Sequence, residues 1–186
     1  TWGDGSVNNE SISTLVKDFR KKSKNIQYSS VEFTSKEFVK FLEPKINNNT
    51  NLGFVISGYS IDKNHPEMFL ININQGNIEG PMQINEDDPL AISWFGDTWF
   101  LSRFLLGIDP NFTEILKNHD LDDDLINNIL LECNDLLQLP LGVPAMPIQD
   151  AIDLVKFLAE LSVNGSRFIP GAQVIGGNID IAVITK

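Results

Sequence analysis

The first residue of the chain, Thr1, has the clearest chemical potential of any side chain in the sequence. An N-terminal threonine carries a hydroxyl nucleophile and an α-amine on one residue, and the amine can accept the proton of the hydroxyl. Such a residue can attack an amide bond when it lies inside an enclosed site. Here a turn-rich stretch, "WGDGSVNN", follows it. We therefore favour the alternative interpretation, in which Thr1 is an arbitrary first residue without a catalytic role.

An acidic stretch, "NHDLDDDLINNILLE", has the carboxylate spacing of a calcium loop at its start. Asp120, Asp122 and Asp124 alternate, as the first ligands of an EF-hand do. Such a loop also needs glycine at its sixth position and glutamate at its twelfth, where this chain has Leu125 and Leu131. The stretch is better explained as an acidic helix start, because carboxylates complement the helix dipole there. We predict no metal site.

The remaining reactive residues are few and widely separated along the chain. His65 lies in a turn, His119 lies in the acidic region, and Cys133 lies in an apolar run typical of a buried thiol. The pair Gly176–Gly177 lies between two expected strands and not at a helix start, so it predicts a tight turn or bulge instead of a phosphate site. We expect no cofactor.

Length and composition narrow the classes of protein and partner. The 186 residues, 42% of them hydrophobic, predict a single domain over residues 1–186. The net charge of −11 argues against nucleic acid or an anionic membrane as a partner, and no apolar run is long enough to span a membrane. One cysteine and no visible secretion signal favour an intracellular, cytoplasmic protein.

Helical periodicity is visible in several segments. The expected helices cover residues 10–24, 34–46, 97–107, 111–138 (one or two helices) and 146–164. Thr34 with Glu37 three positions later predicts a capping box at the start of the second helix. In the last helix we expect one apolar face that includes Ile148, Val155 and Leu158.

Strand-like segments are short and rich in β-branched and aromatic residues. They cover residues 51–59, 67–76, 77–84 and 89–96, with a closing pair at 172–177 and 178–186. The last of these, "NIDIAVITK", alternates apolar residues with a period of two to the end of the chain, which is typical of a strand inside a sheet. The order of elements predicts an α+β fold, with antiparallel sheet covered by helices.

Three stretches together resemble proteasome-type subunits of the Ntn-hydrolase family. The stretch "LGFVISGYSIDKNHPEMFLININQGNIEG" resembles the central hairpin of these subunits. The stretch "AISWFGDTWFLSRFLLG" is similar to their short strand, turn and helix, and the stretch from "MPIQDAIDLV" to "IDIAVITK" resembles their last long helix and closing strand. The resemblance covers most of the chain and involves no invariant motif.

The resemblance implies a four-layer αββα sandwich, with two antiparallel sheets between helical layers. It implies hydrolysis of a peptide or amide bond, and self-association or assembly with related subunits. The residues that it places near an active site are Gly96, Asp97, Ser166, Gly176 and Gly177. An alternative is a non-catalytic structural or interaction subunit of an oligomeric assembly.

The chain departs from the family pattern at its start. The family's nucleophilic threonine begins a buried strand and is followed by an aspartate and then a lysine, whereas Lys17 and Phe33 stand at the expected spacings here. Active subunits also tend to have serine where Asp97 stands. We therefore expect the chain to lack the family's N-terminal catalytic strands, and we identify no nucleophile in it.

Overall fold

The computed structural model describes residues 1–24, 29–88, 90–119, 121–171, 175–176 and 178–185. The fold is α+β with antiparallel sheets, as the sequence predicts. It divides into two compact units, residues 1–91 with the residues from 184 onward, and residues 92–183. The prediction of one domain over residues 1–186 stays a prediction. No helix within the described ranges is long and apolar enough to cross a membrane.

A four-stranded antiparallel sheet organises the first unit, in the order β1–β4–β5–β6. The bounds are Trp2–Gly3 for β1, Leu52–Gly58 for β4, Glu67–Asn74 for β5 and Asn77–Gln83 for β6. A separate hairpin pairs β2 (Ser6–Val7) with β3 (Glu10–Ser11). The sequence predicted β4, β5 and β6 correctly, because each has β-branched or aromatic residues bounded by turns.

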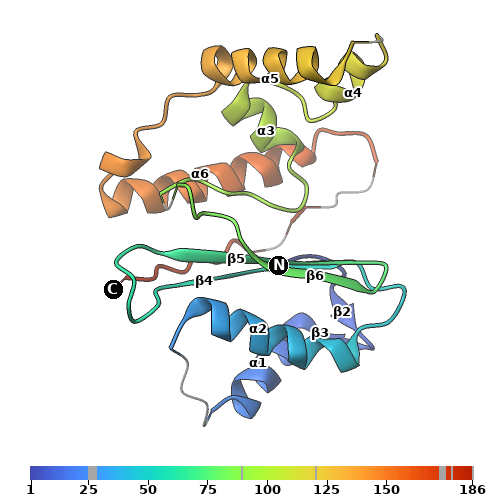
Figure 1. The fold of residues 1–186 in the computed structure, drawn as a ribbon, viewed down its shortest axis with the longest axis vertical. Coiled ribbons are helices and arrows are strands. Elements are labelled where there is room, and N and C mark those ends of the chain that lie inside the picture. Colours follow the sequence, from blue (N-terminus) through green and yellow to red (C-terminus); the bar gives the residue numbers. More distant parts are fainter. Residues whose placement is uncertain (25–28, 89, 120, 172–174, 177, 186) are drawn as a thin grey trace. The chain divides into compact units, whose positions relative to one another are not determined.

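Two helices, α1 (Ile12–Lys22) and α2 (Val31–Leu42), cover one face of the sheet (Figure 1). A short 3-10 turn, η1 (Glu43–Lys45), ends α2. The predicted start of α2 was wrong: Ser30, not Thr34, caps it, and its side chain accepts the amide of Phe33 at 3.0 Å. Thr34 lies inside the helix and donates its hydroxyl to the carbonyl of Ser30 at 2.9 Å.

The core of the first unit lies between these helices and the sheet. Alternate residues of β5 are buried, because successive side chains of a strand point to opposite faces. Phe38 of α2 links the layers, with its ring 4.9 Å from the rings of both Phe19 and Phe54. The buried cluster consists of Val7, Leu15, Phe38, Phe41, Leu42, Leu52, Phe54, Ile71 and Ile73.

The second unit is helical. Its helices are α3 (Trp99–Leu106), α4 (Phe112–Lys117), α5 (Asp123–Leu137) and α6 (Ile148–Ser166), with a 3-10 turn η2 (Val143–Ala145) before α6. α3 packs against both α5 and α6, and α4 packs against α5 (Figure 1). Gly107 ends α3 at a φ of 72°, a left-handed conformation that glycine adopts without strain. The buried apolar residues of this unit include Leu105, Ile126 and Leu158.

Three further sequence predictions differ from the structure. Residues 90–96 form no strand, and residue 89 lies outside the described ranges. On α6, Leu158 is buried as expected, but Ile148 and Val155 are exposed, because the buried side of the helix is centred on Leu158, Ser162 and Ser166.

The third difference concerns the predicted closing strands. Residues 178–185 form no strand, because a period-two pattern becomes a strand only when another strand pairs with it. Of the preceding predicted strand, residues 172–174 and 177 lie outside the described residues.

Candidate functional site

Thr1 lies beside the edge of the sheet. The next two residues form β1, which pairs with Leu52 and Gly53 of β4. Thr1 itself is exposed to solvent. An enclosed site is what makes such a nucleophile effective. The structure therefore gives Thr1 no catalytic environment of its own.

Gly96, Asp97, Ser166 and Gly176 belong to the second unit, where Asp97 and Ser166 make hydrogen bonds to nearby backbone groups. Gly96 has a φ of 87°, and the Asp97 carboxylate accepts the amide of Trp99 at 3.4 Å, at the start of α3. Buried Ser166 donates its hydroxyl to the carbonyls of Val163 at 2.9 Å and Ile175 at 3.5 Å.

The contact with Ile175 brings Ser166 close to the residue before Gly176. Gly177 lies outside the described residues. The hydroxyl of Ser166 is thus used to end α6, and Thr1 belongs to the other unit. The described contacts give neither residue a partner that could act as a general base.

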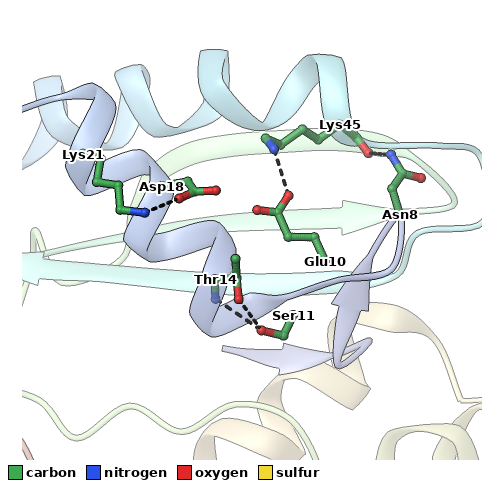
Figure 2. A network of polar contacts seen from close by, with 7 residues as sticks. All are labelled: Asn8, Glu10, Ser11, Thr14, Asp18, Lys21 and Lys45. Atoms are coloured by element: carbon green, nitrogen blue, oxygen red, sulfur yellow. Dashed lines mark hydrogen bonds and ion pairs between the residues drawn. The ribbon is translucent and has the colours of Figure 1, made fainter.

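A polar network joins the β2–β3 hairpin to α1 and to the end of η1 (Figure 2). The Lys45 ammonium lies 2.9 Å from the Glu10 carboxylate, and both side chains are about three-quarters buried. The Asn8 amide donates to the Lys45 carbonyl at 2.6 Å. Ser11 caps α1 through the amide of Thr14 at 3.3 Å. The network therefore fixes the hairpin against the helices.

Asp18 of α1 extends this network, and its carboxylate is held in the charged form. A hydrogen bond from Lys21, 3.1 Å away, is the largest cause that lowers the pKa of Asp18. Burial is the second-largest effect and opposes this shift, while the positive charges of Lys21 and Lys45 lower the pKa further. A carboxylate with a lowered pKa is a weak general base and a poor general acid near neutral pH. The network consequently favours a structural role.

A second polar cluster lies where α2 begins. The Ser60 hydroxyl accepts a hydrogen bond from the backbone amide of Val31 at 3.0 Å and donates one to the Glu67 carboxylate. Glu67 is only 4% exposed. The Lys63 ammonium lies 3.5 Å from the same carboxylate. The carboxylate is thereby compensated, as a buried charge requires. Sequence reasoning missed this cluster, because neither the predicted turn "SIDKNHP" nor Glu67, at the start of the following predicted strand, matches a motif.

A shallow pocket of about 210 Å³ lies next to this cluster, between the start of α2 and the end of β4. The residues that line it are Ser29, Ser30, Val31, Thr34, Ile56, Ser57, Gly58, Tyr59 and Ile61. None of them is an aspartate, glutamate, lysine, arginine or histidine. The pocket therefore suits an uncharged group.

In the second unit, Asp109 receives three donors. The amide of Asn111 lies 2.7 Å from its carboxylate and Trp99 Nε1 lies 2.9 Å from it, and Arg103 donates to it as well. The Asn111 amide is the largest cause that lowers the pKa of Asp109, followed by Arg103 and Trp99. Arg103 also stacks on Trp99 at 4.1 Å. This carboxylate closes the loop after α3 and has little capacity left for a ligand.

The acidic stretch forms a helix start, as predicted. Asp122 caps α5 by accepting the amide of Leu125 at 2.8 Å, and Asp124 lies in the first turn. Asp120 lies outside the described residues. Within the part of the chain that the structure describes, no group of three or more histidine, cysteine, aspartate or glutamate residues is arranged to hold a metal ion.

Comparison with known proteins found no match to this chain among family models, curated proteins or solved structures.

Proposed function

We propose that the chain forms the main part of a proteasome-type Ntn-hydrolase domain, a four-layer αββα sandwich that acts on a peptide or amide bond. This fold is supported by a difference between the two faces of the sheet in the first unit: helices cover one face, and the other carries partly exposed apolar residues. One face is covered by α1 and α2. The other carries a row of directly opposed apolar residues, Val55, Leu70 and Met82, and Met82 is 57% exposed. A second sheet packed on this face would bury the row.

The end of the chain supplies a suitable segment for such a second sheet. Ile179, Ile181 and Val183 alternate with Asp180 and Ala182, and the three apolar residues are 37%, 40% and 50% exposed. A segment with this pattern buries one face only when it is paired within a sheet. Burial of exposed apolar side chains is worth roughly 25 cal/mol per Å². The segment therefore favours a partner strand, which in this proposal lies outside residues 1–186.

The reaction class comes from the family resemblance alone, because a fold does not specify a reaction. In the proposed chemistry an N-terminal threonine, serine or cysteine on a strand outside residues 1–186 attacks the carbonyl carbon. Its α-amine accepts the hydroxyl or thiol proton and then protonates the leaving amine. Backbone amides stabilise the oxyanion. Thr1 is not the proposed nucleophile, since it is exposed at the edge of the sheet.

The test is covalent labelling of the protein purified from its natural source, with a peptide epoxyketone as the probe. We expect one adduct, located by mass spectrometry on the N-terminal residue of a processed chain, and parallel release of a fluorophore from a peptide amide. The matched control is the chain of residues 1–186, which should remain unlabelled at Thr1. A natural protein that neither reacts with the probe nor releases the fluorophore contradicts the hydrolase proposal.

A second candidate function is a non-catalytic subunit of an oligomeric assembly. It is favoured by exposed leucines on α5, where Leu131 is 63% and Leu136 is 73% exposed. Leucines at a subunit interface would lose this exposure. Analytical ultracentrifugation of the natural protein tests it. An oligomer that dissociates when both leucines are changed to glutamine supports the interface, and a monomer at micromolar concentration contradicts it.

A further inference from the structure

Most of the outer edge of β4 has no paired strand among the described residues. On one side β4 pairs with β5 over its whole length, from Leu52 to Gly58. On the other side β1 occupies only Leu52 and Gly53. From Phe54 to Gly58, no strand within the described ranges pairs with this edge. Alternate backbone amides and carbonyls of an edge strand point outward and can pair with a further strand.

The unpaired edge lacks charge, proline and a bulge, three features that protect many sheet edges from pairing. Its sequence is "FVISG", without a charged residue or a proline. Natural edge strands are usually blocked by lysine, by proline, by a bulge or by extreme shortness. The register between β4 and β5 is also regular over these residues. An edge of this kind is suited to a partner strand.

The short strand β1 sets the direction and the register of that partner. It runs antiparallel to β4, with Gly3 opposite Leu52 and Trp2 opposite Gly53. The benzo ring of Trp2 lies against Gly53, where a Cβ would overlap it, so this register accommodates the close contact. Extending the same register places Thr1 opposite Phe54, and a residue ahead of Thr1 opposite Val55.

From this register we propose that the residues immediately ahead of Thr1 in the natural protein continue β1 as a strand along β4, as far as Gly58. This proposal rests on the proposed function in one respect: both require residues ahead of Thr1 in the natural protein. An attached segment is favoured over a separate peptide because β1 already holds its end in place, which gives it a high effective concentration.

The residues of β4 indicate which side chains the proposed strand ahead of Thr1 should carry. Phe54 and Ile56 point to the core below α1 and α2, so the second residue ahead of Thr1, opposite Ile56, is expected to be apolar. The fourth residue ahead of Thr1 lies opposite Gly58, beside the pocket of about 210 Å³. That residue is expected to be uncharged, because no aspartate, glutamate, lysine, arginine or histidine lines the pocket to pair with a charge.

The test is disulfide trapping in the full natural protein, in a Cys133→Ser background that removes the native thiol. One in-register variant combines Ser57→Cys with cysteine at the third residue ahead of Thr1. A second combines Ile56→Cys with cysteine at the second residue ahead, so that both classes of antiparallel pair are sampled. The matched control combines Ser57→Cys with cysteine at the second residue ahead, whose side chain points to the opposite face.

After mild oxidation we expect an intramolecular disulfide in at least one in-register variant, with a yield at least about tenfold above that of the control. Equal yields in all variants overturn the proposal, as does cross-linking between chains only, or no cross-link in protein whose circular dichroism is native. A natural protein that begins at Thr1 also overturns it. The readout is independent of activity, so the strand can be established in a protein that fails the labelling test, or refuted in one that passes it.

Discussion

Replacing Gly53 with alanine tests how β1 is held on the sheet. A Cβ on Gly53 would overlap the benzo ring of Trp2, far inside van der Waals contact. The ring is the far end of a side chain, so it can move away more easily than the sheet backbone can deform. We therefore expect Gly53→Ala to displace Trp2 and to release β1 from β4.

The size of this effect follows from the burial of Trp2, which is partly buried in the native state. Half of the roughly 200 Å² that a tryptophan can bury, at about 25 cal/mol per Å², gives an upper bound of about 2.5 kcal/mol. Two hydrogen bonds between Asp4 and Asn51, both 2.8 Å, can remain in place and limit the loss. We predict a decrease in the free energy of unfolding of about 1–2 kcal/mol.

The assay is a double-mutant cycle measured by urea denaturation, with Gly53→Ala, Trp2→Ala and the double variant. Without the ring, alanine should be tolerated at position 53 or should stabilise the strand by up to about 0.5 kcal/mol, since glycine weakens a strand interior. Gly5→Ala is the control, because a Cβ there meets no other atom within 4 Å. An equal cost of Gly53→Ala with and without Trp2 would refute the reasoning.

Three further predictions concern the same unit. Ser60→Ala removes the hydroxyl that donates to buried Glu67 and that accepts the amide of Val31 at the start of α2. The free energy of unfolding, measured with urea, should therefore fall by about 1–3 kcal/mol. An unchanged free energy of unfolding would contradict the role of this cluster. Leu15→Ala empties a fully buried position and should cost about 2–5 kcal/mol in the same assay; a loss below 1 kcal/mol would mean that this site is not core. Because the pKa of Asp18 is lowered on folding, its stabilisation is present above the ordinary value of 3.8 and is lost as the pH falls through the folded pKa. Lys21→Ala should raise the pKa of Asp18 in an NMR titration, and an unchanged pKa would contradict the assigned cause.

Sequence reasoning located the elements whose signal is local. The apolar spacing of Leu15 and Phe19 predicts α1, and the alternation of Phe69, Ile71 and Ile73 predicts β5. In both cases the residues of one segment determine its periodicity, and the surroundings agree with it. The α+β class follows from the order of such segments.

Elements that depend on distant partners were beyond such reasoning. β1 is only two residues long, and its pairing with Leu52 and Gly53 leaves no periodic signal in the sequence. Residues 178–185 alternate as a strand would but form no strand. The alternation predicts which side chains of a strand would be buried, but it does not predict which strand would pair with it.

The polar clusters were equally hidden from sequence reasoning. Ser60 and Glu67 are separated by a turn, and Lys45 meets Glu10 across 35 positions. A single sequence does not reveal such contacts, since they follow from how the elements pack. The predicted residue Ser166 did prove to be buried, but at the end of a helix, with its hydroxyl bonded to backbone carbonyls.

The most direct test of the proteasome-type hydrolase proposal is the intact mass of the protein isolated from its own source, with its N-terminal residue identified before and after reaction with a peptide epoxyketone. The account predicts a chain heavier than residues 1–186 that begins, after processing, with threonine, serine or cysteine and gains the mass of one probe molecule. A chain that begins at Thr1 and gains no mass would contradict it.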